Sequence, residues 1–112
     1  SIVNLLEETL KVLKKHNKSP KDVLWVGNEF HKTTWVGFES VSNITYDNGY
    51  GSNEIAGDLL IVGDDWWLER GEYDGYDFSE WWDFKALPKC ESNEFKKLVS
   101  VLEGWDFGLE FE

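Results

Sequence analysis

The sequence predicts a single α+β domain spanning residues 1–112, in which a mostly antiparallel sheet of four or five strands is covered by an N-terminal and a C-terminal helix. Three observations predict this class: apolar residues at helical spacing near both ends, a continuous apolar run bounded by turn residues, and two Trp-Trp pairs within strand-like segments. A chain of 112 residues suits one domain with a hydrophobic core of its own.

The N-terminal helix is predicted over about residues 2–16, because the apolar residues of this segment fall on one helical stripe. Lysines in its last turns suit the negative end of the helix dipole. Asn17 can cap the helix end, and Pro20 prevents its continuation. The stripe consists of Ile2, Leu5, Leu6, Thr9, Leu10 and Leu13.

Short elements are expected between this helix and the middle of the chain. Val23–Gly27 is typical of a short strand that leads into a turn. After Thr34, which can act as an N-cap, apolar residues recur at every third position; this favours a short helix, with a strand as the alternative. Residues 46–53 are rich in turn formers and predict a loop or an irregular hairpin. The recurring residues are Trp35, Phe38, Val41 and Ile44.

The middle of the chain predicts three consecutive strands. Leu59–Val62 is a continuous apolar run of the length expected for an interior strand that is covered on both faces. The Gly-Asp-Asp sequence over 63–65 provides a turn, and strands over 66–73 and 79–87 follow, separated by a loop that contains Asp74-Gly75. Together these strands predict an antiparallel meander.

Each Trp-Trp pair must place one indole on each face of the sheet, because adjacent side chains of a strand point in opposite directions. On each strand, the residues of one face are mainly apolar and mark the core face. The residues of the opposite face are aromatic and charged, and we call it the mixed face. There an indole is either covered by another element or offered to a ligand. The core set is Trp66, Leu68, Trp82, Phe84 and Ala86, and the mixed set is Trp67, Glu69, Tyr73, Trp81, Asp83 and Lys85.

The C-terminal segment predicts a second helix followed by a strand. Ser92 or Asn93 can cap a helix whose apolar residues keep helical spacing until Gly104. Over residues 105–111, apolar residues alternate with acidic residues and glycine, which favours a packed strand over a disordered end or a partner-seeking edge. The helical apolar residues are Phe95, Leu98, Val99 and Leu102.

The charge is distributed unevenly along the chain. Residues 1–21 carry five lysines and two glutamates, a net charge of +3, whereas the remainder carries six basic and twenty acidic residues, a net charge of −14; together they give −11. Direct nucleic-acid binding would require the opposite sign over most of the surface. An acidic body suits a basic partner, or simply solubility.

The cysteine content and the lengths of the apolar runs indicate the cellular compartment. The single Cys90 excludes a disulfide framework and suits a reducing cytoplasm. No apolar run approaches the ~20 residues of a membrane helix, so we expect no membrane association.

Four stretches of the chain resemble a family of small uncharacterised acidic proteins that are encoded by phages and prophages of Gram-positive bacteria. The stretches are DLLIVGDDWWLERGEYDG over 58–75, SEWWDFKALP over 79–88, DVLWVG over 22–27 and YDNGYGSNEIAGD over 46–58. The run from Gly63 to Arg70 is the most specific part. The resemblance implies a phage accessory protein in the cytoplasm of the host cell and assigns no activity.

No pattern in the sequence favours catalysis. Eight carboxylates lie between Asp64 and Asp83, and oxygen-rich clusters can bind Ca²⁺ or Mg²⁺, but their spacing matches no calcium-loop signature. Paired carboxylates beside tryptophans could hydrolyse glycosides, although nothing distinguishes an acid from a base. We therefore expect no catalytic residue, no metal and no cofactor.

Protein binding is the function that the sequence favours. The predicted partner-binding residues lie on the mixed face, where aromatic anchors stand among carboxylates that would select a basic partner. A more specific version of this hypothesis is an inhibitor that imitates the charge of nucleic acid and occupies the basic groove of its partner. The alternatives are a small module that binds or cleaves glycans with exposed tryptophans, and aromatics that only cover the sheet. The predicted residues are Trp67, Glu69, Tyr73, Trp81 and Asp83.

Overall fold

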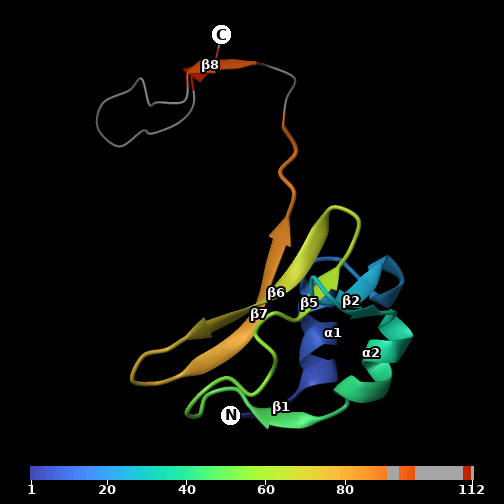
Figure 1. The fold of residues 1–112 in the computed structure, drawn as a ribbon, viewed down its shortest axis with the longest axis vertical. Coiled ribbons are helices and arrows are strands. Elements are labelled where there is room, and N and C mark those ends of the chain that lie inside the picture. Colours follow the sequence, from blue (N-terminus) through green and yellow to red (C-terminus); the bar gives the residue numbers. More distant parts are fainter. Residues whose placement is uncertain (91–93, 98–109, 112) are drawn as a thin grey trace.

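The computed structural model describes residues 1–90, 94–97 and 110–111 (Figure 1). It has an α+β fold in which two helices and a short 3₁₀ helix accompany a mainly antiparallel sheet, as the sequence predicts. In chain order the elements are β1 (Ile2–Asn4), α1 (Leu5–Lys15), the 3₁₀ helix (Pro20–Asp22), β2 (Trp25–Gly27), β3 (Lys32–Thr33), α2 (Trp35–Ser42), β4 (Thr45–Asp47), β5 (Leu60–Val62), β6 (Trp66–Tyr73), β7 (Ser79–Ala86), β8 (Phe95–Lys97) and β9 (Glu110–Phe111).

The main sheet has five antiparallel strands in the order β3-β2-β5-β6-β7. Strand β5 lies between β2 and β6, which confirms the predicted interior position of the apolar run. The predicted cover on both faces is wrong, because Ile61 is buried under the helices whereas Leu60 and Val62 face the other way and are only half-buried. Strands β6 and β7 form the long hairpin of the predicted meander and pair in an unbroken register from Trp66 opposite Ala86 to Tyr73 opposite Ser79. This register decides which side chains of the hairpin become neighbours.

Helix α1 begins three residues later than the sequence predicts. Residues 2–4 form strand β1, which pairs with β4, and Asn4 caps the helix by accepting a hydrogen bond from the backbone N–H of Glu7 at 3.0 Å. The predicted end is confirmed: Asn17 has a positive φ of 59°, and the N–H of Lys18 donates to the carbonyl of Leu13. The backbone bonds to β4 hold residues 2–4 extended, although their apolar spacing also fits a helix.

Helix α2 confirms the favoured interpretation of the segment after Thr34. The Thr34 hydroxyl accepts a hydrogen bond from the N–H of Gly37 at 3.1 Å and so caps the helix. Both helices cover the same face of the main sheet, where Leu13 of α1 and Phe38 of α2 join the buried residues of the central strands in one core. In Figure 1 the two helices stand together on one side of the strands.

The first residues of the predicted C-terminal helix form a strand instead. Phe95–Lys97 forms strand β8, which pairs antiparallel with β9, Glu110–Phe111. The reason is a pairing between segments far apart in the sequence, which helical spacing cannot indicate. The rest of the predicted helix and most of the predicted tail strand lie outside the described residues. Within the described part of the chain, the cover of the main sheet is therefore provided by α1 and α2.

Candidate partner-binding surface

The two faces of the main sheet differ in what covers them. Val26, Ile61 and Leu68, which are neighbours on β2, β5 and β6, point toward the helices and are at most 1% exposed. Their sequence neighbours point the other way and form what we call the outer face. Neither of the described helices α1 and α2 packs on this outer face. The outer face consists of Trp25, Lys32, Leu60, Val62, Trp67, Glu69, Gly71, Trp81, Asp83 and Lys85.

Cross-strand pairing arranges the outer face in rows. One row runs from Trp25 through Val62 and Trp67 to Lys85, and the next brings Leu60, Glu69 and Asp83 together. At the margin beside β3, the ammonium group of Lys32 lies 5.5 Å from the centre of the Trp25 ring. The outer face thus has an apolar and aromatic middle with lysines at two margins.

Trp81 is held flat on the sheet by its neighbours. A Cβ added at Gly71, directly opposite on β6, would lie 2.7 Å from the Trp81 Nε1, so only glycine leaves space for the indole there. The same Nε1–H donates to the Asp83 carboxylate at 2.8 Å. Trp81 nevertheless remains 37% exposed. Its ring is therefore held in place with an accessible surface, as a binding platform requires.

Glu69 and Asp83 face each other directly across β6 and β7. Like charges in this cross-strand position repel each other, since their side chains are about 5 Å apart in a typical antiparallel pair. The pairing thus sets two acidic residues opposite each other, and the Asp83 carboxylate is turned toward Gly71 and accepts the hydrogen bond of the Trp81 indole. The nearest rows provide indoles on either side, from Trp67 and Trp81.

The structure thus brings four of the five predicted partner-binding residues together. Trp67, Glu69, Trp81 and Asp83 occupy adjacent positions on β6 and β7, as the alternation of side chains predicts. Tyr73 is on the same face but at the far end of the hairpin, where its ring lies against Gly75 and is 59% exposed. It stands apart from the other four.

A buried polar cluster on the core face was missed by the sequence analysis, which counted Glu80 only among the eight carboxylates between Asp64 and Asp83. The Arg70 side chain is 4% exposed and donates through Nη2 to the Glu80 carboxylate at 3.1 Å, and Glu80 is 2% exposed. A second carboxylate, Glu8 of α1, lies 3.6 Å from Nη1. The Arg70 guanidinium also lies 4.7 Å from the centre of a Trp82 ring. Alternation along β6 and β7 places Arg70 and Glu80 on the core face, and that was the available signal.

The cluster joins the helix, the sheet and the long loop between β4 and β5. The Tyr46 hydroxyl donates to Glu8 at 2.6 Å and accepts from Arg70 at 3.0 Å, while Glu80 accepts the backbone N–H groups of Glu54 and Ile55. Burial, and then the bond to Glu8, raises the pKa of Tyr46 well above its usual value of 10.0. The cluster thus ties the helix, the hairpin and the loop together, although Nε and Nη1 of the buried Arg70 guanidinium have no hydrogen-bond partner among the described residues.

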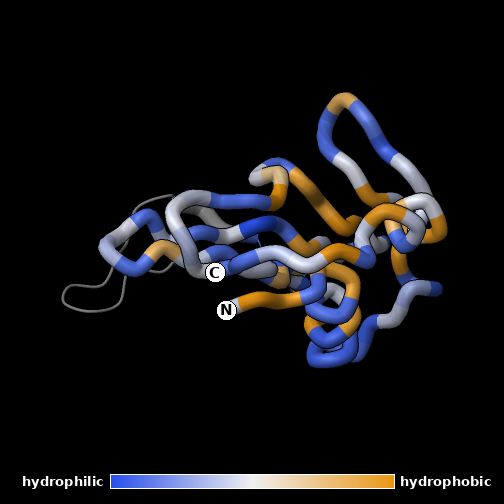
Figure 2. Tube along the Cα trace, turned by 90° about the horizontal axis from the view of Figure 1, so that it is seen from below, coloured by the Kyte–Doolittle hydropathy of each residue, from blue (hydrophilic) through white to orange (hydrophobic). Residues whose placement is uncertain are grey.

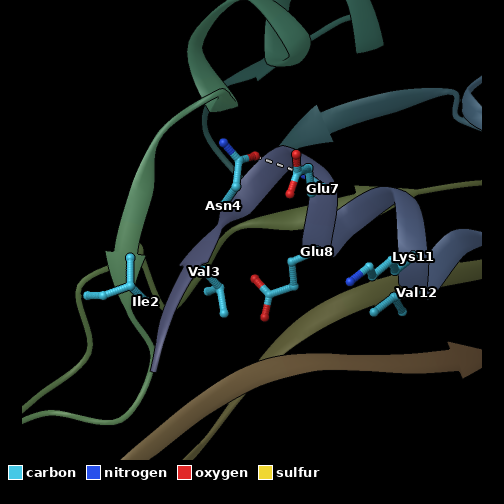
Figure 3. Close-up of a pocket in the computed structure, with 7 residues that line it drawn as sticks. All are labelled: Ile2, Val3, Asn4, Glu7, Glu8, Lys11 and Val12. Atoms are coloured by element: carbon cyan, nitrogen blue, oxygen red, sulfur yellow. Dashed lines mark hydrogen bonds between the residues drawn. The ribbon is translucent and has the colours of Figure 1, made fainter.

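A hollow of about 380 Å³ lies between β1 and the first turns of α1 (Figure 3). Val3, Glu8 and Val12 point into it from one side, and Ile2 also lines it. In Figure 2 the chain is hydrophobic directly after the N-terminus. Its most buried charged group, Glu8, is already bonded to Tyr46. The hollow therefore combines an apolar wall with Lys11, whose ammonium group points toward Glu8 in Figure 3.

No group of three histidine, cysteine, aspartate or glutamate side chains in the described part of the chain is arranged to hold a metal ion. None of the described helices has both the length and the apolar character needed to cross a membrane. No protein-family model matches the sequence, and neither the curated proteins nor the solved structures include a significant match.

Proposed function

We propose that the chain is a non-enzymatic accessory protein that binds a basic protein partner through the outer face of its sheet. The observation that carries the proposal is the pair Glu69 and Asp83, which face each other between two indoles, the half-buried Trp67 and the exposed Trp81. A lysine or arginine side chain from a partner would relieve the repulsion of the two carboxylates and lay its aliphatic stem against Trp67 or Trp81. Trp81 needs little further ordering on binding, because Gly71 and Asp83 already fix its ring.

The resemblance to phage and prophage proteins gives this proposal its biological setting. In that setting the chain acts in the host cytoplasm, and the partner is a host or phage protein. A partner that normally binds nucleic acid would fit the net charge of −14 outside residues 1–21, since the chain would then occupy a basic groove in place of a phosphate backbone. Direct binding of nucleic acid by this chain is not part of the proposal.

Titration with lysine- and arginine-rich peptides and with DNA-binding proteins, followed by calorimetry at low and high salt, tests the proposal. The double variant Glu69→Gln/Asp83→Asn should weaken binding strongly at low salt. The matched control is Glu72→Gln, which removes one charge from an exposed position of β6 whose side chain is on the other face. A double variant that binds like the parent, or equal losses in the double variant and the control, would contradict the proposal.

A glycan-binding module is the second candidate function. It is favoured by the placement of three indoles, Trp25, Trp67 and Trp81, on one face of a sheet, since sugar rings stack on such platforms. Oligosaccharides should then change the tryptophan fluorescence of the parent, and Trp81→Ala should abolish the change while Glu69→Gln keeps it. The same titration with Tyr76→Ala, a fully exposed aromatic in the hairpin loop, serves as the control.

A further inference from the structure

Strand β7 forms an open edge of the main sheet. It is the last strand in the order and pairs on one side with β6. The N–H of Leu87, just beyond β7, donates toward β6, to the carbonyl of Asp65, whereas the N–H of Glu80 points the other way and donates to the carbonyl of Asn48. Because backbone direction alternates along a strand, the even-numbered residues of β7 point their N–H and C=O groups away from β6.

Beyond Glu80, this edge has no partner in the described part of the chain. The N–H and C=O groups of Trp82, Phe84 and Ala86 face it, and no hydrogen bond to another described segment occupies them. The side chains change from half-buried at Phe84 to exposed at Lys85 and Ala86, so the edge is accessible. An accessible row of unpaired backbone groups is a template for another strand.

The charges of β7 fit a second copy of the same strand in one register. Two antiparallel copies that pair about Asp83 place its carboxylate opposite itself, and two copies centred on Lys85 do the same with ammonium groups; both arrangements are repulsive. Pairing centred on Trp82 would need the Glu80 N–H, which already donates to Asn48. Pairing centred on Phe84 places Asp83 of each copy opposite Lys85 of the other, on the same face of the joined sheet.

We propose that β7 is the contact strand of a symmetric homodimer, in which two copies pair antiparallel about Phe84 and join their five-stranded sheets into one. In this register the outward residues of one copy pair with outward residues of the other, and each such pair can exchange both N–H···O bonds. The contact is isologous, so it closes after two chains. It leaves the outer face of each sheet uncovered, and it shares Asp83 with the proposed partner-binding surface.

Sedimentation velocity of the full chain, from micromolar concentration to about 1 mM, tests the proposal. The parent should form dimers that dissociate on dilution. Asp83→Lys and Lys85→Asp each place like charges opposite one another, so each alone should weaken the dimer by about tenfold or more. An equimolar mixture of the two variants restores opposite charges across the contact and should dimerise again. A parent that stays monomeric, or a mixture that does no better than the separate variants, would overturn the proposal.

A backbone variant tests the hydrogen bonding of the same edge. Ala86→Pro removes an N–H that points away from β6, so it should abolish dimerisation and leave the circular dichroism of the monomer unchanged. Ala86→Ser, which keeps the N–H at the same exposed position, should dimerise like the parent. Unimpaired dimerisation of the proline variant would also overturn the proposal.

Discussion

Replacement of Arg70 with methionine should lower the free energy of unfolding by about 3–5 kcal/mol. The guanidinium lies 3.1 Å from the Glu80 carboxylate, and both side chains are at most 4% exposed. At that distance the attraction is about 5 kcal/mol for an effective dielectric constant of about 20. Methionine keeps much of the aliphatic volume, but Glu80 then loses its buried counter-charge, and Glu8 loses the cation 3.6 Å away.

Urea unfolding, followed by circular dichroism with linear extrapolation, measures the loss. A double-mutant cycle with Glu80→Gln isolates the interaction of Arg70 with Glu80. The sum of the losses in unfolding free energy of the two single variants should exceed the loss of the double variant by at least about 1 kcal/mol. The control is Lys85→Met on the outer face, where the same kind of change at an exposed site should stay within about 0.5 kcal/mol. Because the expected loss is a large part of a typical stability of about 5–15 kcal/mol, a stabilising osmolyte keeps the variant folded. The reasoning fails if Arg70→Met costs less than about 1 kcal/mol, or if the two single losses simply add.

Three further predictions concern the helix contact, the Tyr46 hydroxyl and the Trp81 platform. Thr9→Val should cost about 1–3 kcal/mol in urea unfolding, since the buried Trp82 Nε1–H that donates to the Thr9 hydroxyl at 2.9 Å loses its acceptor, and Thr9→Ser should keep most of the stability. The free energy of unfolding should fall as the pH rises above about 10, because the unfolded Tyr46 ionises near its usual pKa of 10.0 while the folded phenol stays protonated; Tyr46→Phe should flatten that part of the profile, and an unchanged slope would refute the assignment. Gly71→Ala should shift the Trp81 indole N–H resonance in nuclear magnetic resonance spectra, because the new Cβ displaces the ring from Asp83, and a spectrum like that of the parent would show that the ring is not held there.

Local patterns sufficed to predict the middle of the chain. The turn over 63–65 and the alternation of the two Trp-Trp pairs indicate both long strands and the face of each indole, because side-chain direction on a strand depends only on position. Thr34 likewise indicates the start of α2 through a bond three residues away. The register of the hairpin could not be predicted in the same way, because it depends on the conformation of the loop between β6 and β7, which sets Glu69 opposite Asp83.

Contacts between distant segments account for what the sequence analysis missed. Strand β1 forms because β4 pairs with it from more than forty residues away. Arg70 and Glu80 lie two positions from core residues and so share their face, but charged side chains are rarely buried. Their burial depends on the approach of Glu8 and Tyr46. The pairing of β8 with β9 is likewise non-local.

The hydrogen bond from Trp82 to Thr9 joins residues 73 positions apart, and His16 at the end of α1 stacks on Phe84 with ring centres 4.0 Å apart. Helix α1 is thus made early during synthesis, whereas its docking strand is made late. Until β7 has been translated, Thr9 and His16 of this segment lack their partners Trp82 and Phe84, and an isolated helix of eleven residues is only marginally stable in water. A domain organised in this way has many long-range contacts and is expected to fold slowly, in a step that waits for the hairpin of β6 and β7.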